Sequence, residues 1–194
     1  MKAAGKLFIK KGFGAVTMEA IAAEAEASKA TLYGYFPSKE SLFEAFVTEA
    51  GKGGIEEIEA AGDGDDAAQI LQRLGLAYLS LVTRQDVIEA NRLVMGEAGR
   101  QPHLSRIFYE SGPRMTLLAI GEKIESLMEA GKLRRSDVRR TSLYFKSLCE
   151  AGLVERQLWG LDGAPDENVR YTAVKNATDV FLMAFGNGNH HSGS

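Results

Sequence analysis

The stretch of sequence that decides the fold is residues 17–39, which read TMEAIAAEAEASKATLYGYFPSK. Apolar residues recur at helical spacing on both sides of Glu26-Ala27-Ser28, which predicts two short helices joined by a tight turn. Ala22 must be small because the helices cross closely there, and Ser28 can cap the second helix. This arrangement is that of a helix-turn-helix, whose second helix enters the major groove of DNA.

Large apolar residues on either side of this stretch are expected to form a small core that fixes the helix pair. The residues predicted for that core are Leu7, Phe8, Phe13, Leu42, Phe43 and Phe46.

The second helix presents a short face that suits DNA. Its small residues would let the backbone approach base edges, and Thr31 could bond a base or touch a thymine methyl. Hydroxyl and ammonium groups on or beside the helix suit phosphates. The candidates of these kinds are Lys29, Ala30, Thr31, Tyr33, Gly34, Tyr35 and Lys39. The alternative is that any alanine-rich helix pair packs in this way and that Lys-Ala-Thr is a solvated face.

The net charge is −3, which argues against a protein coated in nucleic acid but allows a small DNA-reading face. Residues 1–50 hold six lysines and six glutamates and are therefore neutral. Any affinity for DNA must come from the placement of charges and not from their sum.

Residues 3–47 resemble the DNA-binding domain of the tetracycline-repressor (TetR) family. The matching residues are Ala3-Ala4, Leu7-Phe8, Gly12-Phe13, Thr17, Ile21-Ala22, Ser28-Lys29, Thr31-Leu32-Tyr33, Tyr35-Phe36, Ser38-Lys39-Glu40 and Leu42-Phe43. The resemblance implies a dimeric regulator, most often a repressor, that binds a pseudo-palindromic double-stranded DNA operator. It also implies DNA contacts at Thr17, Ser28, Lys29, Ala30, Thr31, Tyr33, Gly34, Tyr35 and Lys39.

Three features depart from the family pattern. Glu26 stands in the turn where the family has glycine, and a non-glycine residue in a left-handed turn costs about 1–2 kcal/mol. Gly34 replaces a larger side chain and removes one base reader. The chain also begins part-way through the usual first helix, without the basic N-terminal arm, which suggests a truncated or late-assigned start.

Helical spacing recurs throughout the chain and predicts an all-α protein of about nine helices. The expected helices span 1–11, 18–25, 29–35, 38–61, 66–83, 86–98, 103–130 with an interruption near Gly112-Pro113, 137–160 and 166–185. We expect a helix-turn-helix domain over 1–47 and a helical ligand-binding and dimerisation domain over 48–186. Residues 62–65 are expected to form a loop, and the polar, glycine-rich residues 187–194 a disordered tail.

The second half resembles the C-terminal domain of the AefR-like subgroup, through Asn91-Arg92-Leu93-Val94, Phe108-Tyr109, Gly112-Pro113 and Gly131-Lys132-Leu133. Such bodies hold an apolar small-molecule effector between helices. Candidate lining residues are Leu74, Tyr78, Arg92, Met95, Phe108, Tyr109, Met115, Leu118, Phe145, Leu148, Cys149 and Trp159. The alternative for each apolar member is an ordinary core position, and Arg92 could hold an effector carboxylate or pair with Glu89 or Glu97.

The last two helices carry more apolar surface than one chain should cover, which predicts a homodimer. The predicted interface residues are Ala151, Val154, Leu158, Val174, Thr178, Phe181 and Phe185. The alternative is that 137–160 lies centrally in one body.

Other classes of protein find little support. The sequence holds no paired catalytic constellation and no metal-ligand spacing, so we expect neither an enzyme nor a cofactor. Cys149 is the one cysteine and is expected in the core. Neither a signal peptide nor a membrane span is present, which predicts a cytoplasmic protein. The remaining rival is a ligand-binding or protein-interaction module with a weakened DNA reader.

Overall fold

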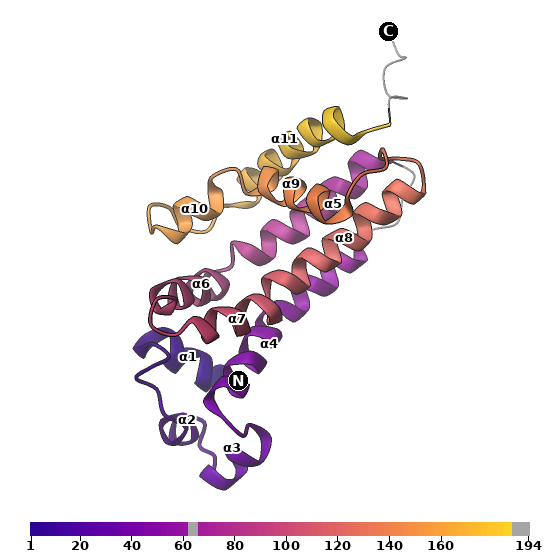
Figure 1. Ribbon diagram of the computed structural model, residues 1–194. Helices are drawn as coiled ribbons and strands as arrows, with labels where there is room; N and C mark the ends of the chain where they lie inside the picture. Colours follow the sequence, from indigo (N-terminus) through magenta and orange to yellow (C-terminus); the bar gives the residue numbers. More distant parts are fainter. Residues whose placement is uncertain (62–65, 188–194) are drawn as a thin grey trace. The chain divides into compact units, whose positions relative to one another are not determined.

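The computed structural model describes residues 1–61 and 66–187, so the predicted loop 62–65 and the predicted tail beyond Asn187 lie outside the described residues. In the described part the chain is all-α, as predicted, and eleven helices follow one another (Figure 1). No helix of this part is long and apolar enough to cross a membrane. The chain divides into two compact units, one of residues 1–53 and 85–114, the other of 54–84 and the chain from 115 onward.

The first unit joins the N-terminal helices to two helices from the middle of the chain. It contains α1 (Lys2–Lys11), α2 (Met18–Glu24), α3 (Lys29–Tyr35), the first part of α4 (Lys39–Ala60), α6 (Gln85–Glu97) and α7 (Pro102–Ser111). The unit therefore extends beyond the domain expected over 1–47, because α6 and α7 pack onto the same core.

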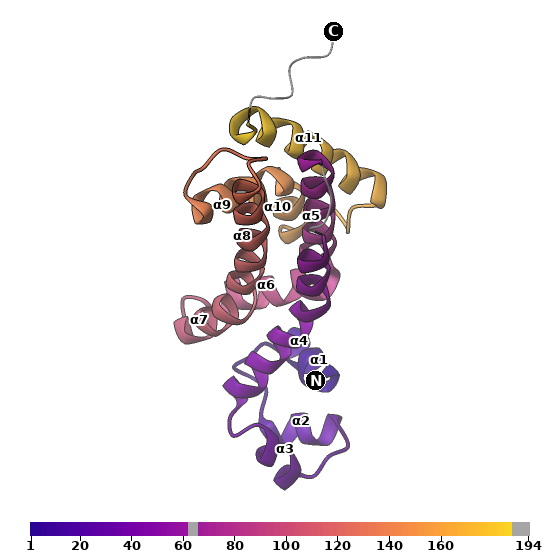
Figure 2. The same cartoon turned by 90° about the vertical axis from the view of Figure 1, so that its right-hand side faces the viewer.

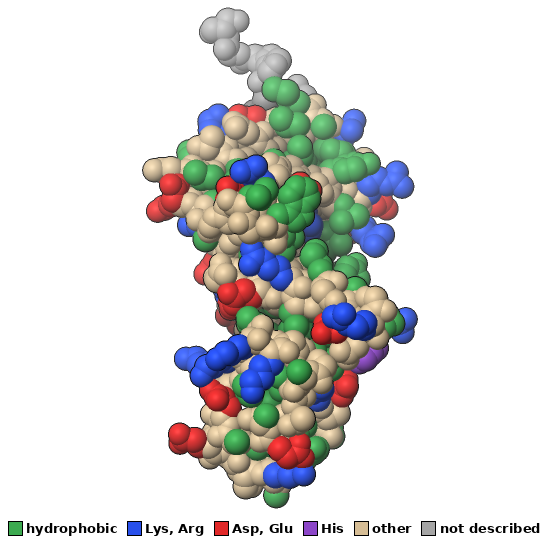
Figure 3. Space-filling model, turned by 90° about the vertical axis from the view of Figure 1, so that its left-hand side faces the viewer, with side chains coloured by type: hydrophobic (Ala, Val, Ile, Leu, Met, Phe, Trp, Pro, Cys, Tyr) green, Lys and Arg blue, Asp and Glu red, His purple; other side chains and the backbone are tan. Residues whose placement is uncertain are grey.

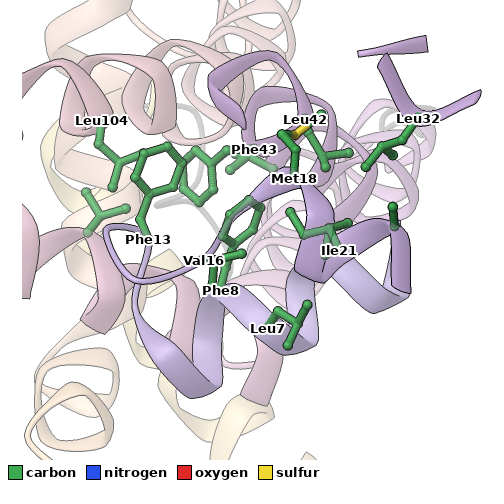
Figure 4. Packing of buried hydrophobic residues seen from close by; sticks show 14 residues of the cluster. Leu7, Phe8, Phe13, Val16, Met18, Ile21, Leu32, Leu42, Phe43 and Leu104 are labelled. Carbon is green, nitrogen blue, oxygen red and sulfur yellow. The ribbon is translucent and has the colours of Figure 1, made fainter. Parts of the chain in front are cut away.

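Three aromatic rings form the centre of this core (Figure 4). The ring of Phe8 lies 5.4 Å from that of Phe13 and 5.5 Å from that of Phe43, measured between centroids. Leu104 of α7 and Val94 of α6 are buried in the same cluster. The predicted small core is thus confirmed. Its contacts with α6 and α7 were not predicted from the sequence.

The second unit is built on α11 (Glu167–Phe185), which packs against α5 (Ala67–Val82) and α9 (Val138–Glu150). Phe145 and Phe181 meet edge to face at 5.1 Å between α9 and α11. The end of α11 is tied to the loop before α9 by a short antiparallel bridge between Leu133 and Gly186. The unit also holds the end of α4, α8 (Pro113–Glu129) from Met115 onward, and α10 (Leu153–Leu158).

Two long expected helices are each divided in the structure. The interruption expected near Gly112-Pro113 is confirmed, because α7 ends at Ser111 and α8 begins at Pro113. The prediction of one continuous helix over 137–160 is wrong. Ala151 and Gly152 take positive φ angles of 28° and 87°, which stops α9 after Glu150 and starts α10 at Leu153.

Candidate DNA-binding interface and ligand-sensing unit

The helix pair of the candidate DNA reader is held by side-chain caps at both of its N-termini. The Thr17 hydroxyl accepts a hydrogen bond from the backbone N–H of Ala20 at 3.2 Å, which caps α2. The Ser28 hydroxyl accepts from the N–H of Thr31 at 3.0 Å, which caps α3. These caps satisfy backbone donors that a helix start otherwise leaves free. Figure 2 shows α2 and α3 as neighbours in this unit.

The turn between the helices has the geometry that the sequence predicted. Glu26 adopts a φ of 52°, in the left-handed region where the family has glycine. The N–H of Ala27 reaches back to the carbonyl of Ala22 at 3.0 Å and closes the turn. Ala22 is buried, as expected for the point where the helices cross.

One side of α3 is exposed and the other is anchored. Leu32 is the buried residue of this helix and contributes to the aromatic core. A methyl group added at Gly34 would meet nothing within 4 Å, so this position is open. The exposed residues are Lys29, Ala30, Thr31, Tyr33, Gly34 and Tyr35, the last with 77% of its surface free.

Lys39 is placed differently from the other basic candidates. Its ammonium donates to the carbonyl oxygens of Phe13 at 2.8 Å and Val16 at 2.9 Å. It also lies 4.4 Å from the centroid of the Phe13 ring. The side chain therefore ties the start of α4 to the loop between α1 and α2.

Two other lysines of the reader are paired with acidic residues of α2. Lys29 Nζ lies 2.5 Å from Glu19 Oε1, and Lys6 Nζ lies 2.5 Å from Glu24 Oε1. The hydrogen bond between Glu19 and Lys29 is the main reason that the pKa of Glu19 is lowered and that of Lys29 is raised. In the first unit red acidic side chains lie beside blue basic ones (Figure 3). Acidic residues thus compensate two of the six lysines of residues 1–50.

The candidate effector-lining residues divide between the two units. Four lie in the first unit, where Arg92, Met95 and Tyr109 are exposed and Phe108 is half-buried. Glu89 accepts a hydrogen bond from the Gln85 side chain, and Glu97 accepts one from the Gln101 side chain. The other eight lie in the second unit. Of these, Leu74, Tyr78, Phe145 and Cys149 are fully buried, Leu148 is half-buried, and Met115, Leu118 and Trp159 are exposed.

A partly buried polar cluster lies in the second unit, and sequence reasoning identified only one of its three members. The Tyr78 hydroxyl of α5 donates to Glu150 Oε1 at 2.5 Å, and Lys146 donates to the same carboxylate at 2.9 Å. Burial, followed by the nearby Glu150 charge, raises the pKa of Tyr78 well above its usual value. Burial likewise raises the pKa of Cys149 to about 12. The (i, i+4) spacing of Lys146 and Glu150 was the available signal.

The predicted dimer residues lie in two kinds of place. Ala151 is exposed, whereas Val154 and Leu158 of α10 are half-buried. On α11 the predicted residues Val174, Thr178, Phe181 and Phe185 are buried in the chain's own core. The opposite face of α11 carries Val169, Ala173, Asn176, Val180 and Met183, which we call the α11 stripe. Its members follow one another at intervals of four and three residues, the spacing of a helix–helix contact.

A groove runs along this stripe. It lies between α11 and the end of α9 with the start of α10, and its lining residues on that side are Leu148, Ala151 and Leu153. Among the stripe residues, Met183 has 87% of its surface free and Val180 has 50%. A contiguous exposed apolar surface is typical of interaction sites in soluble proteins.

A capped helix-turn-helix in one unit, together with a second helical unit, is the architecture of a DNA-binding transcriptional regulator. Two family models match the chain: "Bacterial regulatory proteins, tetR family" over residues 1–46, and "AefR-like transcriptional repressor, C-terminal domain" over residues 69–187. The chain therefore belongs to the TetR family of transcriptional regulators, as its sequence predicted. The resemblance to the AefR-like subgroup is confirmed by the second match.

Solved structures agree with this assignment. A TetR-family regulator from Mesorhizobium loti has a TM-score of 0.83 at 23% identity, over 96% of this chain and 94% of that one. The flavonoid-responsive regulator FrrA has a TM-score of 0.77 at 30% identity, over 96% and 95%. A TetR regulator from Agrobacterium tumefaciens has a TM-score of 0.76 at 25% identity, over 98% and 94%. A search of curated protein sequences finds no match.

Proposed function

We propose that this regulator represses transcription by holding a pseudo-palindromic operator with the exposed face of α3. The observation that carries the proposal is the division of α3 into two sides. Leu32 anchors one side in the core, while Thr31 and its neighbours are exposed on the other, where the Thr31 and Ser28 hydroxyls share a hydrogen bond of 2.7 Å. A regulator of this kind would act in the cytoplasm, where the bacterial chromosome lies. The proposed DNA contacts are Thr17, Ser28, Lys29, Ala30, Thr31, Tyr33, Gly34, Tyr35 and Lys39.

The test is selection of binding sites from random duplex DNA, followed by fluorescence anisotropy on the selected site. Thr31→Ala should weaken binding to that site by about 1–3 kcal/mol and leave binding to unrelated DNA unchanged. Thr48→Ala, an exposed threonine of α4, is the matched control. Equal losses on all sequences would show that Thr31 does not read bases.

The paired lysines favour a second candidate, a ligand-binding module with a weakened DNA reader. Glu19 and Glu24 compensate two cations that phosphates would otherwise meet, and Lys39 is engaged by backbone carbonyls. The same selection decides between the two functions. A sequence-specific site that binds at physiological salt supports the repressor, and binding no better than to random DNA supports the module.

A homodimer is the assembly we propose, with the α11 stripe and the groove beside it covered by a second copy. A two-fold axis would place the same apolar stripe on both sides of the contact. Met183→Glu should then yield monomers, since a charge would be buried without a partner. Met95→Glu makes the same change at an exposed position of α6 and should leave the dimer intact. Size exclusion with light scattering measures the outcome, and a dimeric Met183→Glu would refute this interface.

The effector we propose is a planar, aromatic, mostly apolar molecule bound in the second unit. FrrA, which is 30% identical to this chain, is described as flavonoid-responsive. In this chain Tyr78 and Glu150 supply polar groups among buried apolar residues, which suits a phenol. Calorimetric titration with the flavone apigenin tests whether the protein binds this class of molecule. Tyr78→Phe should weaken binding, whereas Tyr171→Phe, at an exposed position on α11, should not.

A further inference from the structure

The ion pair between α2 and α3 joins a residue of each helix on the outer surface of the DNA reader. Glu19 stands in the first turn of α2, and Lys29 is the first residue of α3. Their charged groups lie 2.5 Å apart, and more than half of each side chain is exposed. The Lys29 ammonium also lies 5.8 Å from the centroid of the Tyr33 ring, so three exposed side chains gather at one place.

The ion pair between Glu19 and Lys29 is expected to contribute little to the stability of the fold. Exposed ion pairs contribute little to folding because water and salt screen them. The two helices are already fixed by the Thr17 and Ser28 caps and by the burial of Ile21 and Leu32. The pair therefore has freedom to serve another purpose.

Its position decides what that purpose can be. In a helix-turn-helix, the N-terminal residues of the second helix contact base edges. Lys29 holds that position, so Glu19 is brought to the same part of the groove. A carboxylate there is repelled by phosphates and needs a hydrogen-bond donor. The donors that bases offer in the major groove are the amino groups of cytosine and adenine.

The chemistry of the pair favours cytosine. A C·G base pair presents an amino donor on cytosine beside the two acceptors, O6 and N7, of guanine. The Glu19 carboxylate is an acceptor and the Lys29 ammonium is a donor, so the ion pair matches that edge group for group. An A·T pair offers lysine no two adjacent acceptors on one base. We propose that Glu19 is a specificity-determining residue that accepts from cytosine N4 while Lys29 donates to the paired guanine.

This inference rests on the proposed function, because it assumes that α3 enters the major groove. The experiment is site selection from random duplex DNA with the wild type and with Glu19→Gln and Glu19→Ala in the full chain. The wild type should select C·G at one position in each half-site. Because glutamine bonds adenine at N6 and N7, Glu19→Gln should change that preference to adenine. Glu19→Ala should lose the preference there, which in the wild type should be about 5- to 150-fold.

A matched control separates base reading from simple neutralisation of charge. Glu24→Gln removes an acidic residue of α2 that is also paired with a lysine, and it should leave every base preference unchanged. Both glutamine variants should unfold at closely similar temperatures, which shows that the helix pair is intact. If Glu19→Gln only strengthens binding to all sequences alike, Glu19 is a counter-charge and the inference is overturned. If the wild type selects no site at all, both the proposed function and this inference fail. If Thr31→Ala loses specificity while the Glu19 variants keep the base preferences of the wild type, this inference alone is overturned.

Discussion

Glu26 is a residue whose type does not suit its backbone conformation. The sequence placed a glutamate where the family has glycine, and the structure gives it a φ of 52°. A residue with a Cβ pays a steric cost there that glycine does not. The turn persists because its neighbours are fixed, with Ala22 buried and the Ala27 N–H bonded to the Ala22 carbonyl.

We predict that Glu26→Gly stabilises the protein by about 1 kcal/mol, which is the relief of left-handed strain less the greater entropy of glycine in the unfolded chain. Urea denaturation followed by circular dichroism measures it. Ala23→Gly, at an exposed position within α2, is the opposite case and should destabilise by about 1 kcal/mol. A Glu26→Gly variant no more stable than the wild type would mean that the strain in the turn does not exceed the entropic cost of glycine.

Lys39 shows what sequence reasoning about a side chain can miss. Its contact with phosphate stays a prediction, whereas spacing along the chain cannot show that Phe13 and Val16 bring two carbonyls within its reach. Those contacts are long-range and depend on how the loop between α1 and α2 folds back.

Lys39→Met keeps the length of the side chain but removes both hydrogen bonds. It should destabilise the protein by about 1.5–3 kcal/mol, the range for hydrogen bonds to a charged group. Lys10→Met, at an exposed position in the last turn of α1, should change the free energy of unfolding little. Equal effects of the two substitutions in thermal denaturation would show that the carbonyl contacts do not matter.

At the scale of elements, most helices could be predicted from periodicity and caps, and the errors have physical reasons. The division after Glu150 was missed because alanine favours helices and Gly152 alone is weak evidence of a break. On α11 both faces carry apolar residues, so the pattern could not show which face packs on α5 and α9. The structure assigns Phe181 to the interior and leaves Val180 exposed.

Replacing either of two adjacent glycines of α4 with alanine should change the free energy of unfolding in opposite directions. A Cβ at Gly53 would meet nothing within 4 Å, whereas one at Gly54 would lie 2.6 Å from Leu81 Cδ1. Gly53→Ala should therefore stabilise by about 0.5–1 kcal/mol through helix propensity alone. Gly54→Ala should destabilise, because the Leu81 side chain must move out of a packed interior.

Chemical denaturation of the two α4 variants measures these changes. Gly96→Ala, at an exposed position of α6 where an added Cβ also meets nothing, should match Gly53→Ala. Destabilisation by both α4 substitutions would mean that this stretch of the helix is not regular in solution.

At the scale of the whole molecule, the sequence identified the DNA reader and the family but not the extent of each unit. Residues 85–114 join the first unit because α6 and α7 bury Val94 and Leu104 against its aromatic core. Such long-range packing leaves no periodic signal in the sequence. α4 belongs to both units, since the boundary between them falls after Gly53 within this helix.

We predict that the effector and the operator oppose each other through α4, a helix whose two ends lie in different units. Two recognition helices in a dimer must match half-sites that repeat about every 34 Å along one face of DNA. An effector that changes α4 would disturb this spacing and weaken binding. By thermodynamic linkage, a saturating selected operator must then weaken apigenin binding by the same factor by which apigenin weakens operator binding. Calorimetry of apigenin with and without operator measures that factor, with an unrelated duplex as the control. If apigenin binds equally well in the presence of the operator, the two sites are not coupled and the second unit only supports the dimer.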